Sequence, residues 1–170
     1  MWPTRFGSLT LPLFGREREG WLYLAAILDV FNRQIVGWSM GDRLSHGILA
    51  DALHKAFRQR KPESGVLFHS DRGTQYASYA FRDLMEQHGF VQSMSSSGNC
   101  YDNALMESFF HTLKTELIYF EKYRTRQEAR GSVFEYIEVF YNCVRRHLTR
   151  RLPSSRNTSL GIELLLSRRV

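Results

Sequence analysis

The longest apolar run in this 170-residue sequence, Trp21 to Leu28, is eight residues long and stops at Asp29. A membrane-spanning helix needs about 20 such residues, so the run predicts no transmembrane segment. It is rich in aromatic and branched residues, and a second run, Ile35 to Met40, follows after a short polar turn. This pairing predicts two strands joined by a tight turn, with the first buried on both faces.

Helical and strand patterns alternate along the rest of the chain. Residues 1–20 hold two prolines and three glycines, so any strand there is expected to be brief and interrupted. The elements predicted after the hairpin are a helix over 45–60, a strand over 66–68, a helix over 76–88, a strand over 90–94, a helix from 103 to about 120, and a helix that a capping box opens at 125–128 and that runs through 144. This order predicts an α/β sandwich with a mixed sheet.

Composition excludes several classes of protein. With 43% hydrophobic and 24% charged residues the chain can bury a sizeable core, which argues against a disordered or fibrous protein. Cys100 and Cys143 form no CxxC pair, so neither a zinc site nor a disulfide framework is indicated. The amino-terminal sequence has no secretory pattern, and we expect a cytoplasmic protein.

Two carboxylates in different settings are the candidates for chemistry. Asp71 follows the predicted strand at 66–68, and Glu107 lies 36 positions later inside a predicted helix. A strand end and a helix face can point two carboxylates at one place, where they could hold divalent ions. Their spacing alone favours the simpler reading, because most acids in a domain of this size are solvated surface groups.

The residues around these two acids change that reading. Residues 68–76 read FHSDRGTQY and residues 98–110 read GNCYDNALMESFF. Both segments resemble the integrase-core transposases of bacterial insertion sequences, of the second-reading-frame type. The resemblance covers about residues 20 to 147 and also includes WLYLA at 21–25, IVGW at 35–38, LKTEL at 113–117, Tyr141-Asn142 and Arg145-Arg146-His147.

The resemblance implies a ribonuclease-H-like fold shared with retroviral integrase cores, a mixed sheet flanked by helices with an extra C-terminal helix. It also implies a triad of two Asp and one Glu that binds two Mg²⁺ or Mn²⁺ ions, and Asp71 and Glu107 match the last two members in identity and interval. The implied activity is metal-dependent cleavage of DNA at transposon ends, followed by strand transfer into target DNA. The expected partners are DNA and further copies of the chain, in the bacterial cytoplasm and associated with the nucleoid.

The first carboxylate of the family pattern is missing. No acid stands between Met1 and Arg16, and the nearest match puts Ser8, or alternatively Gly7, at its position. Neither residue carries a charge to offset two divalent ions, so we expect impaired metal binding and catalysis. Asp29 could replace the missing acid, but the favoured reading is that it caps the turn after its strand.

The resemblance divides the chain into a degenerate first-strand region (1–20), an integrase catalytic core (21–147) and an Arg-rich tail that departs from the family pattern (148–170). The sequence departs from the family pattern on both sides of residues 21–147, which match it well, and this suggests a decayed or frame-shifted copy. The alternative function is a non-catalytic, truncated transposase remnant that binds DNA or an intact transposase. A poorly folded product is a third possibility.

Candidate DNA contacts come partly from helix geometry and partly from the resemblance. His111 and Lys114 lie near the direction of Glu107 on a helix, and Lys114 is the first choice for a DNA phosphate. Asp102 is expected to cap this helix. Arg145 and Arg146 either touch DNA or provide favourable charge at a helix C-terminus. The remaining candidates rest on the resemblance and are Gln75, Tyr76, Asn99 and Asn103.

Overall fold

In the computed structural model of this chain, the structure describes residues 5–14, 20–61, 64–70, 76, 78–94 and 104–145. The strands are β1 (Arg5–Phe14), β2 (Leu22–Asp29), β3 (Ile35–Gly41), β4 (Leu67–Ser70) and β5 (Val91–Met94). The α-helices are α1 (His46–Arg60), α2 (Tyr79–Gln87), α3 (Ala104–Leu113) and α4 (Arg126–Glu135). Two π-helical segments, η2 (Lys114–Ile118) and η3 (Tyr136–Val144), continue α3 and α4.

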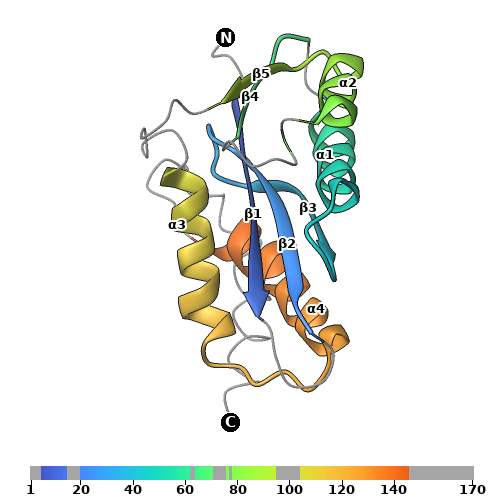
Figure 1. Cartoon of the computed structure of the whole chain (residues 1–170). Coiled ribbons are helices and arrows are strands. Elements are labelled where there is room, and N and C mark those ends of the chain that lie inside the picture. The colour runs from blue at the N-terminus through green and yellow to red at the C-terminus, as the bar shows by residue number, and fades with distance from the viewer. Residues whose placement is uncertain are drawn as a thin grey trace.

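The five strands form one mixed sheet in the order β3-β2-β1-β4-β5. β1 is the central strand, antiparallel to β2 and parallel to β4 (Figure 1). The β2–β3 hairpin is antiparallel, and β4 and β5 are parallel. The predicted mixed sheet and the predicted hairpin are therefore confirmed.

β1 corrects the prediction of a brief, interrupted first strand. It has ten residues and pairs with β2 from Phe6 to Phe14. The proline that was expected to interrupt the strand is tolerated in β1. Pro12 lies beyond the four residues that pair with β4, and a register shift in the pairing with β2 follows between Pro12 and Phe14. Proline is tolerated where a strand lacks a partner on one side, which explains how the strand continues past it.

Side chains alternate between two buried layers along β1. Phe6 belongs to a core shared with α1 and α2, whereas Leu9 and Leu13 belong to a core shared with α3, α4 and the π-helical segments. Helices thus cover both faces of the sheet, with α1 and α2 on the right of Figure 1 and α3 on the left. Phe6 therefore faces α1 and α2, whereas Leu9 and Leu13 face α3 and α4.

The helices follow the predicted periodicity, with one difference. At the start of α4 the Thr125 hydroxyl accepts a hydrogen bond from the Glu128 N–H (3.1 Å), as a capping box requires. The predicted helix from 103 to about 120 changes at Lys114 to a π-helix, as does the last helix at Tyr136. Within the described ranges, no helix is long and apolar enough to cross a membrane.

Candidate functional site

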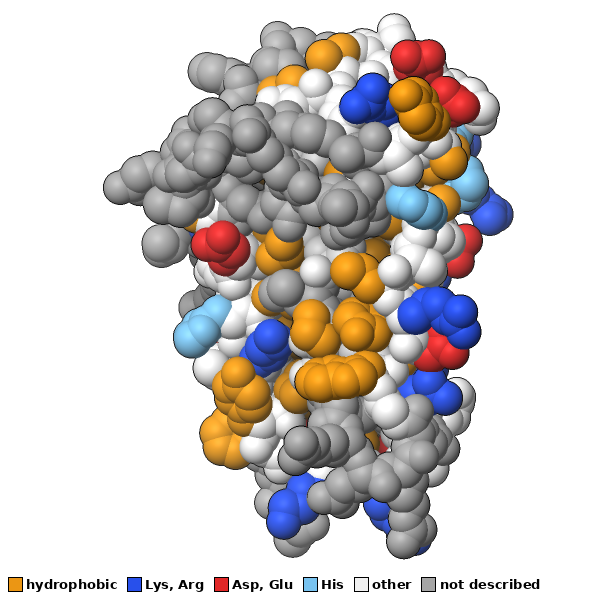
Figure 2. Space-filling model, viewed as in Figure 1, with side chains coloured by type: hydrophobic (Ala, Val, Ile, Leu, Met, Phe, Trp, Pro, Cys, Tyr) orange, Lys and Arg blue, Asp and Glu red, His pale blue; other side chains and the backbone are white. Residues whose placement is uncertain are grey.

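α3 carries Glu107 on an exposed side of the helix. Its buried stripe of Met106, Phe109, Phe110 and Leu113 packs against the sheet, as the periodicity predicts. His111 is exposed one turn beyond Glu107, and Lys114 is half-buried at the start of η2. In Figure 2, acidic, histidine and basic side chains follow one another down the α3 side of the molecule. Of the ion pairs formed between described residues, none includes Glu107.

Ser8 faces the opposite side of the sheet from α3. Its side chain is fully buried, and its hydroxyl lies 2.9 Å from the Tyr76 hydroxyl. Thr10, two residues along β1, lies 3.3 Å from the same hydroxyl. Because Tyr76 belongs to the core shared with α1 and α2, Ser8 points into that layer and away from Glu107.

Gly7 faces α3. A Cβ atom added at Gly7 would lie 3.2 Å from the Cγ atom of Met106, the sequence neighbour of Glu107. In the parallel pairing of β1 with β4, Gly7 is opposite His69 and Ser8 is opposite Ser70, the last residue of β4. Of the two positions that the sequence proposed for the missing acid, only Gly7 is on the face that α3 covers.

Several predicted residues lie outside the described residues, so their positions stay predictions. One of them is Asp71, which comes next in the sequence after Ser70, the last residue of β4. The others are Asp102, Gln75, Asn99, Asn103 and Arg146.

Tyr76 and Arg145 have partners within the protein. The Tyr76 side chain is fully buried with its hydroxyl toward β1, so its ring is not placed to contact DNA as predicted. Arg145 Nη1 donates to both carboxylate oxygens of Glu116, and the Tyr136 hydroxyl donates to Glu116 Oε2 (2.7 Å). Burial and this bond to Glu116 raise the pKa of Tyr136 far above its usual range, which keeps the phenol protonated as a donor. Arg145 thus has a structural partner that the sequence did not reveal.

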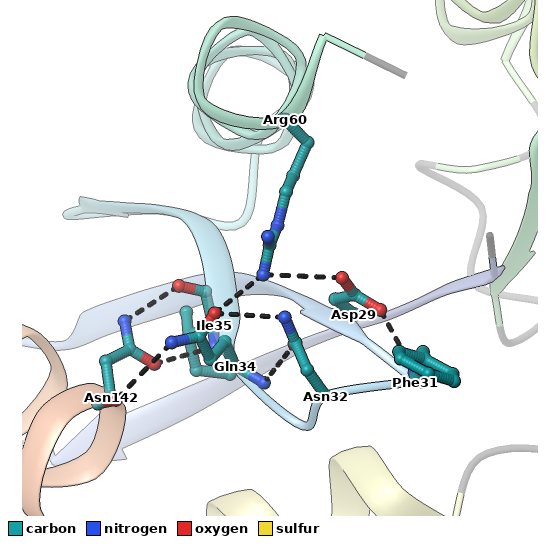
Figure 3. Close-up of polar contacts among 7 residues, drawn as sticks. All are labelled: Asp29, Phe31, Asn32, Gln34, Ile35, Arg60 and Asn142. Carbon is teal, nitrogen blue, oxygen red and sulfur yellow. Dashed lines mark hydrogen bonds and ion pairs between the residues drawn. The ribbon is translucent and has the colours of Figure 1, made fainter. Parts of the chain in front are cut away.

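Asp29 is a structural residue, which confirms the favoured reading. Its Oδ1 accepts a hydrogen bond from the Phe31 N–H (3.0 Å), and its Oδ2 lies 3.4 Å from Arg60 Nη2 (Figure 3). The same guanidinium nitrogen donates to Gln34 Oε1 (2.6 Å). Asp29 therefore fixes the β2–β3 turn to the end of α1. The sequence signal for the ion pair between Asp29 and Arg60 was the position of Arg60 in the last turn of that helix.

The described residues do not by themselves make a two-ion metal centre. No group of three or more His, Cys, Asp or Glu within the described ranges could hold a metal ion. Glu107 is exposed on α3, and Gly7, the residue of β1 that lies beside Met106, has no side chain that could bind a metal ion. Divalent ions such as Mg²⁺ are usually held by more than one carboxylate with water and substrate oxygens.

Comparisons with known proteins agree with the fold. The integrase core domain family matches residues 9–100, and a second family of the same description matches residues 107–159. The chain is 49% identical over 130 residues to an insertion element IS600 uncharacterized 31 kDa protein of Shigella sonnei, covering 76% of this chain and 48% of that protein. It is 46% identical over 132 residues to the transposase InsF for insertion sequence IS3A of Escherichia coli (strain K12), covering 78% and 46%. The chain thus matches about half the length of these relatives.

Solved structures show the same architecture at low sequence identity. The catalytic core domain of BIV integrase has a TM-score of 0.60 and 12% identity, covering 96% of this chain and 97% of that one. A chain of the simian T-cell lymphotropic virus intasome with PP2A regulatory subunit B56 gamma has a TM-score of 0.66 and 15% identity, covering 91% and 56%. The HTLV-2 integrase catalytic core domain in complex with magnesium has a TM-score of 0.58 and 11% identity, covering 78% and 83%. These likenesses confirm the ribonuclease-H-like fold.

Proposed function

Because this chain belongs to the integrase-core family of insertion-sequence transposases, we propose that it contains the core that cleaves and joins DNA strands, weakened by a missing carboxylate on β1. The observation that carries the proposal is the exposed Glu107 on α3, combined with an acid at position 71 directly after β4. β4, the strand that precedes Asp71 in the sequence, pairs with β1, and α3, which carries Glu107, packs against β1.

Asp71 and Glu107 are the proposed ligands for Mg²⁺ or Mn²⁺. When bound, such ions activate the attacking oxygen and stabilise charge in phosphoryl transfer. Two protein carboxylates in place of three leave more ionic charge uncompensated, so weak metal binding is expected. The magnesium bound to the HTLV-2 integrase core supports a divalent ion in this fold.

DNA is the proposed partner, as transposon ends and target. His111 and Lys114 follow Glu107 on α3 and η2 and are the proposed phosphate contacts. Arg145 is a weaker candidate because Glu116 already accepts its hydrogen bonds. Assembly of several copies on DNA, in the cytoplasm and on the nucleoid of a bacterium, belongs to the same proposal, which the bacterial relatives and the intasome support.

The test is nicking, at millimolar Mn²⁺, of a labelled duplex that carries a transposon end. We expect slow nicking by the unaltered chain, loss of nicking in Glu107→Gln, and no change in Glu86→Gln, a matched control at an exposed acid on α2. Lys114→Ala is expected to weaken duplex binding in a filter assay. Nicking that survives Glu107→Gln contradicts the proposal, and duplex binding without nicking by the unaltered chain favours the non-catalytic remnant.

A further inference from the structure

Tyr119 and Phe120 form an exposed aromatic pair directly after η2. Their exposed fractions are 71% and 81%, whereas Ile118, the last residue of η2, is buried. Each ring leaves a large apolar area in water, which is unfavourable unless a partner covers it. We infer that this aromatic pair is a stacking surface for unpaired bases of a DNA strand. The inference rests on the proposed function for the choice of DNA as the partner.

The backbone that carries the aromatic pair is held in place by hydrogen bonds. The Tyr119 N–H donates to the Lys114 carbonyl (2.9 Å), and the Phe120 N–H donates to the Leu117 carbonyl (3.2 Å). Ile118 packs in the core shared with α3 and α4, and among the described residues neither aromatic ring of the pair belongs to a core cluster. The rings are therefore presented on a fixed backbone, so that binding orders little of the chain.

Basic residues lie on both sides of the aromatic pair in the sequence. Lys114 precedes it at the start of η2, and Lys122 and Arg124 follow it, both exposed. None of the ion pairs between described residues includes any of these three cations. Surfaces that bind single-stranded nucleic acid combine aromatic rings, on which bases stack, with cations that hold the phosphates.

The acids near the aromatic pair neutralise little of this positive charge. The Glu116 carboxylate accepts the hydrogen bonds of Arg145, and Glu128 accepts the Arg124 N–H (2.7 Å), which leaves the exposed Glu121. The centre of a contact surface for another protein is usually depleted of lysine and of acids. The charge around the aromatic pair therefore favours a DNA strand over a protein surface.

The aromatic pair continues the row of side chains on the α3 side of the molecule. In Figure 2, apolar side chains follow below the acidic, histidine and basic ones on that side. Tyr119 comes five positions after Lys114, which is at most about 7.5 Å along a helix axis. Nucleotides of one strand are about 3.4 Å apart along a duplex, so a strand bound at Lys114 reaches the rings within about two or three nucleotides. Only bases that have left the duplex expose a face for stacking.

The experiment compares the affinities of the full 170-residue chain for a short labelled oligothymidine strand and for a duplex of the same length, by fluorescence anisotropy at one salt concentration. We expect Tyr119→Ala/Phe120→Ala to bind the single strand about tenfold more weakly and the duplex less than about twofold more weakly. Phe31→Ala/Tyr79→Ala is the matched control. It removes one Phe and one Tyr that are 72% and 85% exposed elsewhere, and it should leave both affinities unchanged.

Further variants separate ring stacking from apolar contact. Tyr119→Leu/Phe120→Leu keeps apolar side chains without rings and should lose the single strand as the alanine variant does, whereas Tyr119→Phe/Phe120→Tyr should keep it. Lys122→Gln/Arg124→Gln should lower the slope of log affinity against log salt for the single strand by about 1.4. Circular dichroism checks the folding of every variant.

The inference is overturned if the unaltered chain does not bind the single strand, or if the folded alanine variant binds it unchanged. Equal weakening for strand and duplex, or equal weakening in the control variant, also overturns it. Self-association that the alanine variant loses while it still binds the strand assigns the aromatic pair to a protein contact instead. If the chain binds the strand through the rings but does not nick the duplex, the stacking surface stands and the proposed cleavage function fails.

Discussion

Asn142 uses both ends of its side-chain amide to hold the first residue of β3. Its Oδ1 accepts from the Ile35 N–H and its Nδ2 donates to the Ile35 carbonyl, both at 2.9 Å (Figure 3). Asn142 is buried on η3, 107 positions away in sequence. One side chain therefore joins the C-terminal helix to the edge of the sheet.

At the residue scale, we predict that Asn142→Leu lowers the free energy of unfolding by about 2 to 4 kcal/mol, because both backbone groups of Ile35 lose their partner in a buried place. Asn142→Asp keeps an acceptor for the Ile35 N–H but places a buried carboxylate oxygen against the Ile35 carbonyl, so it should lose at least as much stability as Asn142→Leu. Urea unfolding measures all three proteins. A loss below about 0.5 kcal/mol for Asn142→Leu would mean that water replaces the amide.

At the element scale, β3 is one of the two edge strands of the described sheet, and side chains bind carbonyl groups of this strand. Lys55 Nζ donates to the Trp38 carbonyl (3.0 Å), and Arg130 Nη1 donates to the Met40 carbonyl (2.9 Å). Lys55 also lies 5.2 Å from the centre of the Trp38 ring. With Asn142 on Ile35, these contacts protect an edge that would otherwise be open to another strand.

We therefore predict that the double variant Lys55→Ala/Arg130→Ala self-associates more readily than the unaltered chain, since it exposes unpaired carbonyls and loses two charges beside them. Light scattering against protein concentration measures the effect, and the loss of stability should be no more than about 2 kcal/mol. The control Arg58→Ala/Lys122→Ala removes two exposed charges elsewhere. Equal association of both double variants would assign the effect to net charge rather than to the strand edge.

At the scale of the whole molecule, local apolar patterns predicted most helices and strands. The extent of β1 and the faces of its residues depend on pairing between strands that are distant in sequence. The β2–β3 hairpin and α1 could be predicted from the sequence because their apolar runs are long and regular. The full length of β1 could not be predicted, because pairing with β2 and β4 on its two sides stabilises a strand that contains Gly7 and Pro12. The site shows the same limit: the resemblance to integrase-core transposases linked Asp71 to Glu107, but whether position 7 or Ser8 faces α3 depends on strand register, which alternates residue by residue.

The net positive charge of the chain is concentrated at the C-terminal end of the sequence. The last 26 residues hold seven arginines and one acid, which accounts for the entire formal charge of +6. If the tail from 148 to 170 binds DNA through phosphates alone, each contact contributes about 0.9 to the slope of log affinity against log salt. Changing its five arginines to glutamine should then lower that slope by up to about 4.5 for any duplex sequence. Fluorescence anisotropy from 50 to 200 mM salt measures the slope, and an unchanged slope would assign DNA binding to the α3 face and its neighbouring residues instead of the tail.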